Sequence, residues 1–252
     1  MNTRGRISGG SWVFPIVLVI TAGAGIACAQ GIHPVGLWVF IVVLGGWLLT
    51  LCLHEFAHAV VALAGGDTSV RDRGYLTLNL FKYTDRVNSF LIPLILLAIG
   101  GIPLPGGAVL VEPHRLRQKW WSSLVSAAGP LVNLISGALI TIAAVPMTSN
   151  LGAALAFLGV IQFVAGVLNL LPIPGFDGFG IITPYLSQSF LVAIQPFRQW
   201  APLALFAILF TVPGASQWLF DVAGHLFDAV GGDRYQWAVG ANLFPNLRNL
   251  SW

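Results

Sequence analysis

The stretch His54-Glu55-Phe56-Ala57-His58 lies inside the long apolar run from Leu37 to Gly65. On a helix, which turns about 100° per residue, His54 and His58 lie on one face one turn apart, where both imidazoles can bind one metal ion. Glu55 projects toward the same side, close enough to act on a water molecule at that metal. The spacing therefore predicts a zinc site with a general base beside it.

The alternative is that two ordinary buried histidines and a glutamate fell at this spacing by chance. The chain has only 5 His and 9 Asp plus Glu, so a chance match is rare. An ionisable side chain near the centre of a membrane helix also costs about 2.5 to 3.5 kcal/mol, even on the lenient insertion scale. Zinc binding, with apparent free energies of about 10 to 16 kcal/mol, offsets this cost. The sequence therefore favours a metal site.

The composition indicates a polytopic membrane protein. The chain is 56% hydrophobic and 8% charged, with a mean hydropathy of +0.83, whereas a soluble domain is about 25% charged. The net charge of +3 comes from Lys and Arg in loops beside apolar spans. This pattern sets membrane topology, so we expect contact with a lipid bilayer and no nucleic-acid partner.

We expect an all-α polytopic membrane protein with about five or six transmembrane helices, folded as a single membrane domain over residues 1–252. A core over residues 37–178 is expected to carry the metal site. Residues 179–252 are expected to add one or more spans and an interfacial amphipathic C-terminal region. Phe179 to Gln195 and Ala201 to Val212 form either one span kinked at Pro196 or two half-segments.

The loop charges predict the orientation. Trp12 to Ala29 is interpreted as a retained first span, with a cleaved signal peptide as the alternative, and either places the N-terminus in the cytoplasm. The loop from Gly66 to Asn88 is basic and should be cytoplasmic. Its basic residues are Arg71, Arg73, Lys82 and Arg86. The His-Glu-His stretch then lies in the cytoplasmic half of a membrane, which we expect to be a bacterial cytoplasmic membrane.

The region between the His-Glu-His helix and the next span, Trp121 to Val145, is expected to hold a small membrane-associated β-hairpin or re-entrant segment. Phe90 to Leu104 is apolar but short and broken by glycines and prolines, and a single crossing would invert the loop charges. Gly74 to Asn79 alternates as a short strand does, and Pro105 to Val111 reads as a turn feeding a β-branched strand.

The span from Leu151 to Leu171 is followed by two prolines, Pro172 and Pro174, which end the helix. Such a break is tolerated in a bilayer where the freed backbone groups line a polar cavity. Asp177 lies at the break, at the depth expected for the two histidines. Catalytic zinc has three protein ligands, and Asp177 is preferred as the third over carboxylates in charged loops. Those alternatives are Asp67, Asp72, Asp85 and Glu112.

Together these stretches resemble the site-2 protease family of intramembrane zinc metalloproteases. The stretches, in the order of the family, are His54 to His58, the Gly106-Gly107 strand, Ala128-Gly129-Pro130, and Asn169 to Gly178. The resemblance implies one zinc ion per chain, held by His54, His58 and Asp177, with Glu55 as general base. It implies that Asn169 holds the substrate or stabilises the oxyanion, and that a strand including Gly106, Gly107 and Val109 pairs with an unwound substrate.

The function implied by the resemblance is hydrolysis of a peptide bond within or near a transmembrane segment of a membrane protein. A site-1 protease would first shorten this substrate, and we expect a compact form without PDZ or CBS domains.

Two alternatives stay open. One is a non-enzymatic zinc-binding or transport protein, although transport needs ionisable residues at successive depths and here they cluster at one level. The other is an inactive protease homologue acting as a binding module.

Overall fold

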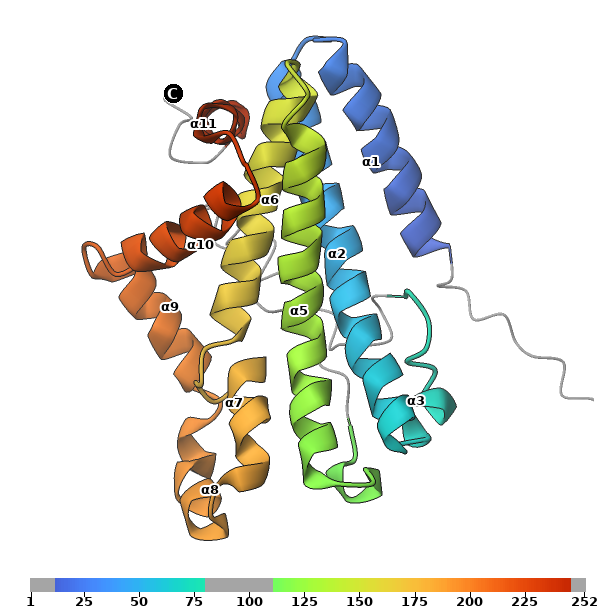
Figure 1. Cartoon of the computed structure of the whole chain (residues 1–252), viewed down its shortest axis with the longest axis vertical. Helices are drawn as coiled ribbons and strands as arrows, with labels where there is room; N and C mark the ends of the chain where they lie inside the picture. Colours follow the sequence, from blue (N-terminus) through green and yellow to red (C-terminus); the bar gives the residue numbers. More distant parts are fainter. Residues whose placement is uncertain (1–11, 80–110, 246–252) are drawn as a thin grey trace, which may run out of the picture.

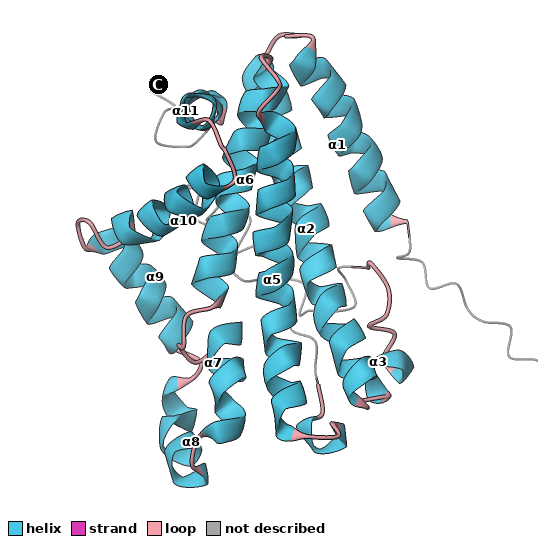
Figure 2. Ribbon diagram, in the orientation of Figure 1, coloured by secondary structure: helices cyan, strands magenta, loops and turns pink. Residues whose placement is uncertain are grey.

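The computed structural model describes residues 12–79 and 111–245, and within these ranges the chain is helical with no strand (Figure 2). The α-helices are α1 (Val13–Ala29), α2 (Val35–Gly65), α3 (Ser69–Asp72), α5 (Lys119–Ala144), α6 (Asn150–Asn169), α7 (Asp177–Ile182), α8 (Gln188–Ile194), α9 (Ala201–Thr211), α10 (Gln217–Ala229) and α11 (Arg234–Leu243). Three short 3-10 turns are η2 (Pro113–Arg115), η3 (Thr183–Tyr185) and η4 (Gln195–Phe197).

Among the described residues, three helices are long and apolar enough to cross a membrane: α2, α5 and α6. A fourth candidate is the pair Gln188–Phe197 and Ala201–Thr211, which is bent by 58° at a break. Helix α1 is apolar but has 17 residues, about 25 Å, which is less than the roughly 30 Å of a hydrocarbon core. The chain is an integral membrane protein with three or four candidate spans in its described part, fewer than the expected five or six.

Helix α6 is the central helix of the bundle. In its most apolar window 83% of the residues are buried, compared with 50% in α2 and 39% in α5. It contacts α1, α2, α5, α10 and α11. Helix α5 instead exposes an apolar row to the lipid, at Leu131, Ile135, Leu139 and Ile142. Polar side chains on α6 are therefore surrounded by protein, and each needs a local partner.

Two apolar clusters hold the other helices against α6. The first joins α1, α2 and α6 through residues such as Val43, Trp47 and Leu158. The second joins α6, α9 and α10 through residues such as Val160, Phe206 and Phe227. Because lipid tails are as apolar as these side chains, close packing rather than exclusion of water stabilises the contacts.

Helix α10 is amphipathic and packs by one face. Leu219, Ala223 and Phe227 are buried, whereas Trp218 and Val222 are exposed. The buried row is spaced by four residues and packs against α6. The C-terminal region is thus attached to the bundle core by α10.

Helices α2 and α6 run in the same direction and α5 runs in the opposite one (Figure 1). The Arg117 backbone N–H donates to the Gly65 carbonyl over 2.9 Å. The segment from 66 to 118 therefore begins and ends at the same end of the bundle, as the loop charges predict. Its expected re-entrant part, Phe90 to Leu104, and the strand residues Gly106 to Leu110 lie outside the described residues.

The expected strand at Gly74 to Asn79 is wrong. Gly74 has a positive φ of 73°, which turns the chain, and the Thr77 hydroxyl donates to the Gly74 carbonyl over 3.0 Å. The Tyr75 N–H donates back to Val70. The alternating side chains fit a strand, but the glycine and these local hydrogen bonds turn the backbone back on itself instead.

Asp67 fixes the end of α2 to the segment that leads into α5. It is fully buried, and its carboxylate accepts hydrogen bonds from the Ser69 N–H (3.0 Å), the Ser69 hydroxyl (2.6 Å) and the Glu112 N–H (2.8 Å). Burial by itself raises the pKa of Asp67, but the hydrogen bonds from Glu112 and Ser69 outweigh this effect and hold the pKa below its usual value.

This arrangement predicts a stability that depends on pH. Because the folded-state pKa of Asp67 is lowered, its contribution is present above the unfolded pKa of about 3.9 and is lost as the pH falls through the folded value. Asp67→Asn should lower the unfolding free energy at pH 7 by about 1 to 3 kcal/mol and flatten the loss of stability below about pH 4. Thermal unfolding of metal-free protein in detergent measures both effects.

The matched control is Asp72→Asn, because Asp72 is an exposed carboxylate on the neighbouring α3. It should leave the pH profile of unfolding unchanged. If Asp67→Asn unfolds with the parent's acid profile, Asp67 does not stabilise this junction as a charged group.

Candidate metal centre

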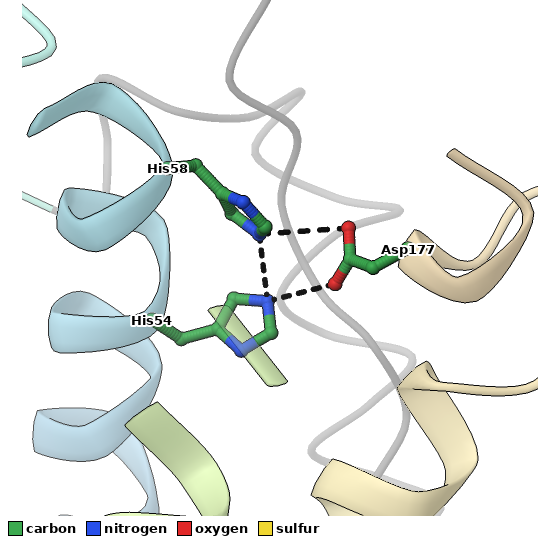
Figure 3. Close-up of side chains that lie close together, drawn as sticks. All are labelled: His54, His58 and Asp177. Atoms are coloured by element: carbon green, nitrogen blue, oxygen red, sulfur yellow. Dashed lines mark hydrogen bonds and ion pairs between the residues drawn. The ribbon is translucent and has the colours of Figure 1, made fainter. Parts of the chain in front are cut away.

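His54, His58 and Asp177 meet between two helices (Figure 3). His54 and His58 are buried one turn apart on α2, and Asp177 is the first residue of α7. The Nε2 atoms of the two histidines are 3.1 Å apart. Asp177 Oδ2 lies 3.2 Å from His54 Nε2, and Asp177 Oδ1 lies 3.5 Å from His58 Nε2. One donor atom from each residue can thus reach a common metal ion, since these atoms all lie within 4.8 Å of one another.

The break after α6 brings Asp177 to the histidines. Helix α6 ends at Asn169, and the chain resumes as a helix at Asp177. A Cβ on Gly178 would overlap the carbonyls of Leu170 and Leu171. The chain thus folds back on itself so closely that only glycine fits after the aspartate.

The outer nitrogen of each imidazole has a hydrogen-bond acceptor. His54 Nδ1 lies 2.5 Å from Asn133 Oδ1, and His58 Nδ1 lies 2.6 Å from the Val125 carbonyl oxygen. Because a carbonyl oxygen can only accept, both Nδ1 atoms carry the proton and donate it. Neutral rings in this tautomer turn the lone pairs of both Nε2 atoms toward each other and toward the Asp177 carboxylate.

These converging acceptors fit a cation, and the combination of two imidazoles and one carboxylate fits zinc. Space for the ion is kept by Gly129 of α5, where a Cβ would overlap the Nε2 atoms of both His54 and His58. The Ala128-Gly129-Pro130 motif of the sequence thus lies directly against the centre. Any larger side chain at 129 would fill the space between the donor atoms.

A cavity of about 430 Å³ adjoins the centre. Glu55 and Asn169 line it together with the two histidines and Asp177. Glu55 is 2% exposed and Asn169 is 4% exposed. Asn169 Oδ1 has no hydrogen-bond partner in the part of the chain that the structure describes. A buried polar atom without a partner beside a cavity can bind a ligand group there.

The other candidate ligands lie elsewhere. Asp67 is held by Ser69 and Glu112, and the Glu112 carboxylate is paired with Arg73 and Arg115. Asp72 is exposed on α3, and Asp85 lies outside the described residues. The remaining histidines, His33, His114 and His225, are exposed loop or surface residues. Among the described carboxylates, only Asp177 shares a metal-binding group with His54 and His58.

Sequence reasoning missed the groups that surround the histidines. The Val125 carbonyl gives no sequence signal, because every residue has one. Nothing in the sequence around Asn133 indicates its contact with His54. Gln162 is an amide in the middle of an apolar run, and such a residue signals a buried polar partner. What the sequence lacks is the register of α5 against α6 and α2, which brings these amides to His54.

The chain is similar to bacterial proteins along most of its length. It is 41% identical over 241 residues to the "Putative zinc metalloprotease Rip2" of Mycolicibacterium smegmatis, a match that covers 92% of each chain. It is 42% identical over 209 residues to the protein of the same name in Mycobacterium tuberculosis, covering 81% of this chain and 80% of the relative. The "Putative zinc metalloprotease YwhC" of Bacillus subtilis is 29% identical over 202 residues, or 75% of this chain and 88% of the relative.

No family model matches the chain, and no solved structure matches it.

Proposed function

Because the chain belongs to the site-2 protease family of zinc metalloproteases, we propose that it hydrolyses a peptide bond within or near a transmembrane segment of a membrane-protein substrate. The observation that carries this proposal is the placement of the site. His54, His58, Asp177 and Glu55 line one cavity, and two of the helices around it, α2 and α5, are long and apolar enough to span a membrane. This placement supports a substrate whose peptide bond comes from within or beside the bilayer.

His54, His58 and Asp177 would hold the zinc ion. When bound, zinc lowers the pKa of a water molecule and polarises a substrate carbonyl. Glu55 takes the proton of the attacking water and passes it to the leaving amine, the role of a general acid and base. Its burial in the cavity wall supports this role, because a carboxylate shielded from bulk water keeps the proton within the site.

Asn169 is proposed to donate a hydrogen bond to the oxyanion of the tetrahedral intermediate. Its place in the cavity supports this role, since the Nδ2 group is the part of the side chain that can donate. Its Oδ1 makes no hydrogen bond to another helix among the described residues. Asn169→Ala should lower kcat by about 10² to 10³ and leave the zinc content unchanged. Steady-state kinetics and metal analysis on the same preparation measure both.

The matched control is Thr183→Val. Thr183 lines the same cavity, but its hydroxyl already donates to the Phe179 carbonyl over 2.7 Å. This variant should keep most of the parent's kcat. A zinc-loaded Asn169→Ala protein with parental kcat would remove Asn169 from the mechanism.

A helical substrate hides its peptide bonds, so it must become extended before it is cut. We propose that the segment with Gly106, Gly107 and Val109 pairs with it as a strand. These residues lie outside the described ranges, but the residues that follow support the placement. Val111 lines the cavity, and the Glu112 N–H is bound to Asp67 at the end of α2.

We further propose that the whole chain acts as one membrane domain, with α1 as an additional span that tilts little or thins the bilayer locally. Leu155 of α6 and Trp237 of α11 pack against both apolar clusters, which supports a continuous core.

The basic loop between α2 and α5 supports a cytoplasmic placement of the site, and the bacterial relatives support a bacterial cytoplasmic membrane. A site-1 protease would shorten the substrate first.

The proposed substrate class is tested by comparing membrane proteomes. Cells that lack the chromosomal gene receive either the parent or Glu55→Gln, expressed at equal levels. Membrane proteins cut by the parent should accumulate uncut in the variant, with the cleavage point in or next to a transmembrane segment. Accumulation of soluble proteins instead, or of none, would contradict the proposed substrate class.

A further inference from the structure

Gln162 is a fully buried amide in the middle of the central helix α6. Such a residue is expensive at membrane depth and is kept only when it has a partner or a task. Its Oε1 accepts a hydrogen bond from Asn133 Nδ2 of α5 over 2.9 Å. Its Nε2 has no hydrogen-bond partner among the described residues. One side of Gln162 is therefore used and the other is left unpaired, so packing between α5 and α6 alone does not explain this residue.

The bond to Gln162 fixes which way the Asn133 amide points. Asn133 has an NH₂ group that can only donate and an oxygen that can only accept. Because its Nδ2 faces Gln162 Oε1, its Oδ1 faces His54 Nδ1 at 2.5 Å. If the Asn133 amide turned over while Gln162 kept its orientation, two oxygens would face each other at Gln162 and an NH₂ group would face the imidazole.

The orientation of Asn133 in turn fixes the tautomer of His54. An acceptor at Nδ1 holds the proton on that nitrogen and leaves the Nε2 lone pair directed at His58 and Asp177. An NH₂ group at the same place would hold the proton on Nε2, where it blocks metal binding.

We propose that Gln162 and Asn133 form a relay that positions His54 for zinc, with Gln162 acting only through the direction of the Asn133 amide. His58 needs no such relay, because its Nδ1 donates to the Val125 backbone carbonyl, which cannot turn over. The inference rests on the metal site of the proposed function, but it concerns zinc affinity and not proteolysis.

The test is a titration of zinc against a chromogenic chelator on detergent-purified protein. Asn133→Leu should weaken zinc binding by about 10- to 100-fold, the usual effect of losing an outer-shell partner of a histidine ligand. Gln162→Leu should weaken zinc binding by about tenfold, because the amide of Asn133 is then free to turn over. Asn133→Asp should keep parental affinity or exceed it, since a carboxylate accepts on both of its oxygens.

The decisive variant is the double substitution Asn133→Asp/Gln162→Leu. A carboxylate has no wrong orientation, so it no longer needs Gln162, and the double variant should bind zinc as tightly as Asn133→Asp alone. If Gln162 merely supports the packing of α5 on α6, the loss from Gln162→Leu should persist in the Asn133→Asp background. Disappearance of the Gln162→Leu effect in the Asn133→Asp background would be non-additive. That result separates a relay from two independent structural effects.

Thr141→Val is the matched control, because Thr141 is another fully buried polar residue of α5 whose Oγ1 has no partner among the described residues. It should bind zinc as the parent does.

Should Gln162→Leu fail to fold, the comparison of Asn133→Leu with Asn133→Asp still tests the acceptor at His54. Parental zinc affinity in folded Gln162→Leu or Asn133→Leu would overturn the relay. Normal zinc affinities in a protein that cuts no membrane substrate would instead contradict the proposed function and leave the relay intact.

Discussion

Glu55→Gln is expected to reduce proteolysis by about 10² to 10⁴-fold while the zinc content of the protein stays at the parent's level. Glutamine has the size of glutamate but cannot take a proton from water at neutral pH. Glu55 lines the cavity beside the metal-binding group and does not belong to it, so its loss should affect the reaction and not the metal. Cleavage of a reconstituted transmembrane substrate, with metal analysis on the same sample, measures both.

A Glu55→Gln protein that also loses its zinc would make Glu55 a ligand. One that retains parental cleavage would remove Glu55 as the general base, and another group would have to take the proton. The Asp72→Asn variant serves as a charge-matched control, because it removes an exposed carboxylate that does not line the cavity.

Gly129→Ala should weaken zinc binding at least as much as losing an outer-shell partner does, by about 100-fold or more. The added Cβ would overlap the Nε2 atoms of His54 and His58, and these atoms are buried on a helix that cannot shift without repacking the core. Cleavage should fall with the zinc content. Chelator competition in detergent measures the affinity, and addition of excess zinc should restore part of the activity.

Gly23→Ala is the control for this glycine substitution, because a Cβ on Gly23 of α1 meets no atom within 4 Å. It should leave zinc affinity and cleavage unchanged. A folded Gly129→Ala protein with parental zinc affinity would show that the ion does not occupy the space between the two Nε2 atoms and Gly129.

The sequence predicts those parts of the centre that depend on local spacing. His54 and His58 follow from the helical period, and Asp177 follows from two prolines that end α6 at the depth of the histidines. These features are fixed by a few neighbouring residues. The structure accordingly brings His54, His58 and Asp177 together.

The parts that the sequence does not predict depend on how separate helices meet. The contact of Asn133 with His54 and Gln162 needs the register between α2, α5 and α6, and no local pattern encodes it. The strand prediction for Gly74 to Asn79 is wrong for another reason. Alternating side chains do not show that Gly74 adopts a positive φ, which turns the chain. The described residues hold three or four candidate spans where five or six were expected, because α1 is short and the pair Gln188–Phe197 and Ala201–Thr211 is bent. Hydropathy alone does not separate such helices from full crossings.

The most direct test of the central claim is the zinc stoichiometry of detergent-purified protein, with the parent beside Asp177→Ala. Two helices that are far apart in sequence supply the proposed ligands, and Asp177 is the only one from α7. We predict about one zinc per chain in the parent, and loss or sharp weakening of binding in the variant. Full zinc retention in Asp177→Ala would contradict a centre that joins α2 to α7.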